Sequence, residues 1–131
     1  MAHFIVEYTR NIAAEAGIPA LLRKANETLI AQGDVYPIGG LRSRAIALED
    51  WYIADGAEDY AFVHATFKLG AGRAREIRQR TGDALFEMMK THFAELYARR
   101  YLALSLELYE FDEAGTWKQN NIHARFRREQ A

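Results

Sequence analysis

The alternation of apolar and polar side chains predicts four β-strands along this chain. The clearest spans residues 101–109, where four leucines occupy every second position and therefore lie on one face of a sheet. Residues 3–8 and 60–68 have the aromatic and β-branched content of strands, and a strand at residues 41–48 begins polar and ends apolar.

Two stretches between these strands have the periodicity of amphipathic helices. In the first, Pro19 stands near the first helical position, where a missing N–H costs nothing, and Gly33 is a suitable C-terminal glycine. Its apolar face consists of Leu21, Leu22, Ala25 and Leu29. From Arg73 to Arg100 apolar residues recur at spacings of three, four and seven, which predicts one long amphipathic helix.

The order strand, helix, strand thus occurs twice, in residues of about 2–50 and 59–110, with Phe4 and Phe62 in matching places. Right-handed β-α-β crossovers put both helices on one side of the sheet. We therefore expect an α/β (α+β) fold in one domain, residues 1–131. It is a duplicated β-α-β arrangement whose four-stranded, mostly parallel or mixed sheet carries two helices on one face.

The other face of such a sheet needs a cover, and the pattern predicts no further helix. The tail with Arg125, Arg127 and Arg128 is expected to be a solvated terminus. The most plausible cover is another copy of the chain, which predicts a closed homo-oligomer.

Composition excludes several classes of protein. Of the 131 residues 50% are hydrophobic and 27% charged, and the formal net charge of −1 gives no overall field for nucleic acid. Without cysteine there is no disulfide, thiol nucleophile or thiolate metal site. The chain has no basic, apolar leader and no long apolar run, so we expect neither export nor a membrane span, and a cytoplasmic location.

The amino terminus is the first candidate for chemistry. A strand begins at His3, so the terminal amine is held where the sheet starts rather than carried into solvent on a leader. Its reference pKa of about 7.7 to 8.0 falls when the amine is buried or lies beside arginines.

Two groups of arginines are candidates for binding an anion. Arg73 follows a glycine turn, residues 70–72, at the start of a helix, although Arg75 replaces the third glycine of a dinucleotide fingerprint. Such a turn more often serves the fold than a ligand. Arg42 and Arg44 share one face of their strand, which continues through Ile46 and Leu48 toward the core. Their partner is either a protein carboxylate, which composition favours, or a ligand carboxylate.

The remaining polar residues give weaker indications. The four histidines, at positions 3, 64, 92 and 123, stand singly and never in a metal-ligand spacing, so we expect no metal and a surface or packing role for each. Residues 118–121, Lys-Gln-Asn-Asn, form a polar cluster able to reach a ligand, or else a turn or a final edge strand.

Taken together, six segments of the chain resemble the 5-carboxymethyl-2-hydroxymuconate Δ-isomerase family of the tautomerase superfamily. They are the start His3-Phe4-Ile5-Val6-Glu7, Gly40-Leu41-Arg42-Ser43-Arg44, Asp59-Tyr60-Ala61-Phe62-Val63-His64, Gly70-Ala71-Gly72-Arg73, Lys90-Thr91-His92-Phe93 and Lys118-Gln119-Asn120-Asn121-Ile122-His123-Ala124. The likeness runs nearly end to end and keeps one order, which is more specific than any single segment.

The resemblance implies a homotrimer with its helices outside, and a cofactor-free isomerase that moves a proton along an unsaturated polycarboxylate in bacterial 4-hydroxyphenylacetate catabolism. The base of such enzymes is the amine of an amino-terminal proline. Arg42 and Arg73 match the family's carboxylate-binding arginines, while we assign the matching Arg44 to a salt bridge. Residues 118–121 are candidates for lining the pocket.

One position departs from the family pattern, because Ala2 stands where the resemblance implies proline. If Met1 is removed, the primary amine of Ala2 takes nearly the same place as a general base. The departure leaves two alternatives open: a non-catalytic protein that binds carboxylates, or different tautomerase-fold chemistry such as decarboxylation or dehalogenation.

Overall fold

A four-stranded mixed sheet forms the centre of the computed structural model, which describes residues 1–130, with side chains described as far as residue 126. Its strands are β1 (Ala2–Thr9), β2 (Leu41–Leu48), β3 (Tyr60–Gly70) and β4 (Tyr101–Phe111), in the order β2-β1-β3-β4. β1 runs parallel to β2 and antiparallel to β3, and β3 runs parallel to β4. The strand that starts the chain therefore lies inside the sheet, paired on both edges.

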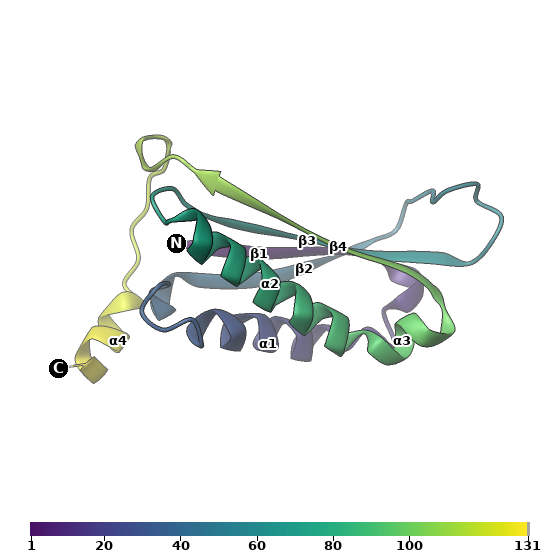
Figure 1. The fold of residues 1–131 in the computed structure, drawn as a ribbon, viewed down its shortest axis with the longest axis horizontal. Coiled ribbons are helices and arrows are strands. Elements are labelled where there is room, and N and C mark those ends of the chain that lie inside the picture. The colour runs from purple at the N-terminus through teal and green to yellow at the C-terminus, as the bar shows by residue number, and fades with distance from the viewer. Residues whose placement is uncertain (131) are drawn as a thin grey trace.

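Two helical connections lie on one face of this sheet (Figure 1). α1 (Ile18–Ile30) joins β1 to β2, while α2 (Arg75–His92) and α3 (Ala94–Arg99) join β3 to β4. The predicted duplication and mixed sheet are confirmed. The single helix expected from Arg73 to Arg100 is wrong in detail: it begins at Arg75 and breaks at the buried Phe93, whose φ of −96° and ψ of 9° end the helix. No helix within residues 1–130 is both long and apolar enough to cross a membrane.

The core lies between the helices and one face of the sheet. Alternate residues of β1 and β3 are buried there, and Phe4 pairs directly with Phe67. Phe62 lies on the other face, because its neighbours Ala61 and Val63 point into the core. The suggested match of Phe4 with Phe62 is therefore wrong, although the two halves agree in the order of their elements. The predicted single face of leucines in β4 is confirmed: Leu102 is buried, and Leu104, Leu106 and Leu108 pack against the core.

The orientation of β2 differs from expectation. Ser43 faces the helices, where its hydroxyl donates a hydrogen bond of 2.5 Å to Asn26 Oδ1 of α1. Because side chains alternate, Arg42 and Arg44 lie on the uncovered face, and so does Ile46, which is 50% exposed rather than directed toward the core. Leu41 and Ala45, which share the face of Ser43, pack against the core, so this half-apolar face of β2 is the covered one.

The face opposite the helices carries exposed aromatic and aliphatic side chains. In addition to Ile46, Tyr101 and Tyr109 are 64% and 49% exposed. No other part of the described residues covers this face (Figure 1). An isolated chain would leave it in water.

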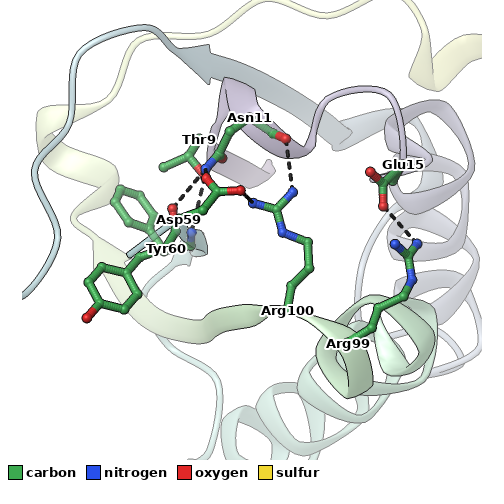
Figure 2. A network of polar contacts seen from close by, with 8 residues as sticks. Thr9, Asn11, Glu15, Asp59, Tyr60, Arg99 and Arg100 are labelled. Carbon is green, nitrogen blue, oxygen red and sulfur yellow. Dashed lines mark hydrogen bonds and ion pairs between the residues drawn. The ribbon is translucent and has the colours of Figure 1, made fainter. Parts of the chain in front are cut away.

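A polar network fixes the end of the sheet remote from the amino terminus (Figure 2). Arg100 donates hydrogen bonds to Asn11 O at 3.1 Å and to Asp59 Oδ2 at 2.8 Å. The Asn11 amide in turn donates to Asp59 Oδ1 and to Tyr60 O. These contacts hold the end of β1 against the starts of β3 and β4, which gives this cluster a structural role.

The chain ends in elements that the sequence pattern did not predict. After β4, a short 3-10 turn (Glu113–Gly115) leads into an extended segment and then α4 (His123–Gln130). The expectation of no further helix is wrong for this backbone. The Asn120 side chain explains the difference, because its oxygen accepts a hydrogen bond from the Ile122 N–H and its amide donates to Gly39 O. The side chains of Arg127 and Arg128 lie outside the described part.

Candidate functional site

The start of the chain is held in a fixed position at one end of the sheet. Ala2 pairs with Leu41 of β2 and with Leu69 of β3, and it is only 4% exposed. Gly40 approaches Met1 so closely that a Cβ added to it would lie 3.3 Å from Met1 Cα. The expectation that the sheet holds the amine in place agrees with this geometry.

The terminal amine lies among positively charged side chains. Partial burial lowers the pKa of the Met1 amine below its ordinary value, and the charges of Lys118, Arg73 and Arg42 lower that pKa further. The Glu113 carboxylate acts in the opposite sense and raises it. More of this amine is therefore neutral, and able to accept a proton, at neutral pH than of an exposed amine.

Arg73 is anchored by backbone carbonyls but keeps part of its donor capacity. Its Nε and Nη2 donate to Val35 O at 3.3 and 3.0 Å, and its Nη1 donates to Gly70 O at 3.1 Å. Its guanidinium carbon also lies 4.8 Å from the centre of the Tyr36 ring. A guanidinium has five N–H donors. These contacts use three, so one hydrogen on each terminal nitrogen remains for a carboxylate.

Arg42 and Arg44 lie on the strand beside the terminus, on the uncovered face. Arg42 Nη1 makes a long contact of 3.5 Å with Gly40 O, whereas Arg44 Nη1 donates to His3 Nδ1 at 3.1 Å. Burial first, and then Arg44 and Arg42, lower the pKa of His3. The salt bridge assigned to Arg44 is wrong within the described residues: none of the ion pairs there includes Arg44, and its hydrogen-bond partner is this imidazole.

No ion pair within the part of the chain that the structure describes involves Arg42 or Arg73. The protein carboxylate that composition favours as the partner of Arg42 is thus missing among these residues. Two guanidinium groups beside a terminal amine, without an acidic partner of their own, suit an anion that comes from outside the chain.

Glu113 and Lys118 complete the surroundings of the amine. Lys118 Nζ lies 3.1 Å from Glu113 Oε2, and both side chains are about half exposed. Sequence reasoning included Lys118 in a polar cluster but missed Glu113. No local pattern could have found it, because the turn after β4 brings it back over Gly70, where an added Cβ would lie 2.6 Å from Glu113 Oε1.

The C-terminal segment reaches the amine through a close backbone approach. Asn120 Nδ2 donates to Gly39 O at 2.8 Å, and a Cβ on Gly39 would lie 2.8 Å from the backbone nitrogen of His123. Only glycine leaves room for α4 to begin here. The C-terminal segment thereby packs against the turn that precedes β2, and Figure 1 shows both termini at the same end of the molecule.

The other histidines form structural contacts. His64 lies between Ser105 Oγ at 2.7 Å and Glu107 Oε1 at 3.0 Å, and His92 Nε2 lies 2.7 Å from Ala16 O. Among the side chains that the structure describes, residues 1–126, no three His, Asp or Glu are grouped so as to hold a metal ion.

Comparisons with known proteins agree on one family. The family model for 5-carboxymethyl-2-hydroxymuconate isomerase matches residues 2–126. A 5-carboxymethyl-2-hydroxymuconate Delta-isomerase of Escherichia coli is 51% identical over 127 residues, which cover 97% of this chain and 100% of that protein.

Solved structures show the same fold. A crystal structure of a 5-carboxymethyl-2-hydroxymuconate isomerase from Deinococcus radiodurans R1 is 50% identical with a TM-score of 0.92, and the match covers 95% of this chain and 93% of that one. A structure described as a fused 4-OT wild type symmetric trimer has a TM-score of 0.64 at 18% identity, covering 89% of this chain and 93% of that one. The more distant of the two supports the fold alone.

Proposed function

Because the chain belongs to the 5-carboxymethyl-2-hydroxymuconate isomerase family, we propose that it isomerises 5-carboxymethyl-2-hydroxymuconate or a closely related unsaturated polycarboxylate. The reaction moves a proton from an enol to another position on the carbon chain. It needs a base that is neutral at the working pH and cations that hold the carboxylates. We propose that these residues supply both without a cofactor.

The proposed base is the amine of Ala2, set free when Met1 is removed. Removal shortens the chain by about 3.3 to 3.6 Å. The amine would then stand on Ala2, which is already fixed between β2 and β3. A neutral amine there takes a proton from the enol and returns it elsewhere on the substrate. Since Ala2 carries a primary amine where the family resemblance implies a secondary one, we expect reduced but measurable turnover.

Arg42 and Arg73 are the proposed carboxylate-binding residues. The observation that carries the proposal is that both guanidinium groups act on the terminal amine, and neither pairs with a carboxylate among the described residues. Arg73 retains one N–H on each terminal nitrogen, which matches the two oxygens of a carboxylate. Arg42 faces the same end of the sheet from β2.

We also infer a homotrimer in the cytoplasm. The uncovered sheet face, with Ile46, Tyr101 and Tyr109 exposed, supports an assembly in which neighbouring copies cover this face and enclose the site. Light scattering on the purified protein tests the assembly, with three times the chain mass expected. A stable monomer at micromolar concentration would contradict it.

The function is tested by measuring turnover and processing on one sample. Ultraviolet absorbance follows loss of the conjugated enol of 5-carboxymethyl-2-hydroxymuconate, and an intact mass spectrum reports whether Met1 is present. A portion of the same protein is treated with cyanate near neutral pH, which carbamylates the α-amine in preference to lysines because of its lower pKa.

We expect turnover by protein that lacks Met1, and loss of turnover after carbamylation of its α-amine. Inactive protein of the processed mass would contradict the proposal. Full activity after carbamylation would remove the amine from the mechanism. A protein that only binds carboxylates would give heat on titration with the substrate but no change in absorbance.

A further inference from the structure

The pair formed by Lys118 and Glu113 lies beside the terminal amine and has no evident duty in the fold. The two side chains are 42% and 54% exposed, and the Nζ to Oε2 distance is 3.1 Å. Exposed ion pairs of this kind contribute little to stability. The surrounding backbone nevertheless holds both partners in place.

Glu113 is positioned by a rigid turn. Asp112 Oδ1 accepts a hydrogen bond from Ala114 N at 3.0 Å, and Ala71 N donates to Phe111 O at 3.0 Å, which ties this turn to the glycine loop. Glu113 Oε1 therefore lies against Gly70, the residue whose carbonyl accepts a hydrogen bond from Arg73. The carboxylate stands next to a donor set that is suited to a carboxylate.

Lys118 is positioned from the other side. Two residues further along, Asn120 is bonded to Gly39 O, and His123 packs on Gly39 and Gly40, which contacts Met1. The extended segment from residue 116 to 120 is thus anchored at both ends across the start of β1. Lys118 projects from the middle of that segment.

We propose that Lys118 is a third carboxylate-binding residue of the site, and that Glu113 occupies it in the free protein until a substrate carboxylate displaces it. The inference rests on the proposed function in so far as the ligand is a polycarboxylate. Glu113 then acts as an internal substitute for one carboxylate of the ligand, and competes with it.

The balance of charge at the site supports this assignment. Of the groups that act on the amine, Lys118, Arg73 and Arg42 are cationic and Glu113 alone is anionic. A substrate with two or more carboxylates offers one to the guanidinium groups and one to Lys118. An ammonium has three N–H donors and no fixed plane, so it can exchange Glu113 for another carboxylate without rearranging the backbone.

Opposite effects of the two partners distinguish this role from a structural one. We would compare K118M, K118R and E113Q, with K90M as the matched control, because Lys90 forms a somewhat more exposed pair with Glu87 on α2. Calorimetry measures the Kd of trans,trans-muconate, a linear unsaturated dicarboxylate. Absorbance measures KM and kcat for 5-carboxymethyl-2-hydroxymuconate.

Loss of one charge-assisted contact predicts a Kd and KM about tenfold higher for K118M, with kcat changed much less. K118R should recover most of the affinity. E113Q should bind about threefold more tightly than the original protein, since Lys118 no longer has a competing carboxylate. K90M should change none of these values.

Equal weakening by K118M and E113Q would overturn the inference, because a purely structural ion pair is broken alike from either side. An unchanged Kd for K118M, or no muconate binding by the original protein, would overturn it as well. Should E113Q fold poorly, E113D replaces it: the shorter carboxylate cannot reach Lys118, so tighter binding is again expected. Muconate binding with all these effects but without turnover would refute the proposed function and support this inference.

Discussion

Replacing Arg73 with lysine tests whether this one side chain both stabilises the fold and binds the substrate. R73K keeps the positive charge near the terminal amine but removes the planar fork of donors. A lysine ammonium cannot reach Val35 O, Gly70 O and a ligand together in the geometry that the guanidinium uses. Both stability and substrate binding should therefore fall.

The magnitudes follow from the contacts. The guanidinium makes three hydrogen bonds to two carbonyls and lies over the Tyr36 ring, from a half-buried position. Each hydrogen bond contributes about 1 kcal/mol, and we expect lysine to retain one of the three. Because the site is partly exposed to solvent, the free energy of unfolding should fall by about 1.5 kcal/mol. For a chain of this size that lowers Tm by about 5 °C. Loss of the bidentate contact, about 2 kcal/mol, should lower kcat/KM about 30-fold.

Circular dichroism melts and absorbance kinetics measure the two effects separately. Because ground-state carboxylate binding is lost, most of the kinetic change should appear in KM. The matched control is R75K: Arg75 is exposed at the first position of α2 and takes no part in the described ion pairs. We expect its Tm and kcat/KM to stay unchanged.

Three outcomes would refute this reasoning. A kcat/KM for R73K within threefold of the original value would show that the free donors of Arg73 do not bind substrate. An unchanged Tm would show that the bonds to Val35 and Gly70 contribute nothing. Equal losses in R75K would show that exchanging any arginine for lysine at the start of this helix has the effect, and that the fork of Arg73 has no special part in it.

The remaining predictions concern pH and two side chains. The neutral amine of Ala2 is the proposed active form, and we expect it to share the burial and the neighbouring cations that lower the pKa of the Met1 amine. The kcat/KM should therefore rise with pH at a midpoint below the ordinary value of about 8 for an α-amine, and K118M should move that midpoint upward; a rise centred above 8 would contradict this. Y36F loses the buried 2.7 Å hydrogen bond between Tyr36 and Thr81, which should lower the free energy of unfolding by about 1 kcal/mol and Tm by about 3 °C. The kcat/KM should stay unchanged, since the ring under Arg73 remains, and an unchanged Tm would contradict the prediction. The imidazole of His3 should titrate by NMR below its ordinary pKa of about 6.5, and R44M should raise that pKa, whereas no change in R44M would exclude Arg44 as a cause.

The sequence predicts those parts of the fold in which one pattern has one solution. The alternating leucines of β4 fix its covered face, and Pro19 agrees with the start of α1. The covered face of β2 does not follow from its pattern, because both faces are half apolar. In the structure Leu41 and Ala45 pack against the core and Ser43 bonds to Asn26. The break at Phe93 likewise depends on burying that ring in the core and not on a helix-breaking residue.

The candidate site could be predicted in part. Ala2, Arg42 and Arg73 were chosen from the position of the first strand and from a family likeness, and the fold does bring the charges of both arginines to bear on the terminal amine. Glu113 could not be found, because its contact with Gly70 joins segments far apart in the sequence. α4 does not follow from the sequence pattern, because it is short and has few apolar residues, and its start depends on the contacts of Asn120.

The placement of β1 between two partner strands has a practical consequence for preparing this protein. An affinity tag fused ahead of Met1 would have to leave the sheet at the point where Gly40 and His123 close in on the chain. Even a single residue left behind by a tag-cleaving protease would turn the proposed basic nitrogen into an amide. Recombinant material with such a remnant would give no turnover even where its arginines still bind carboxylates, so a native start is required for activity.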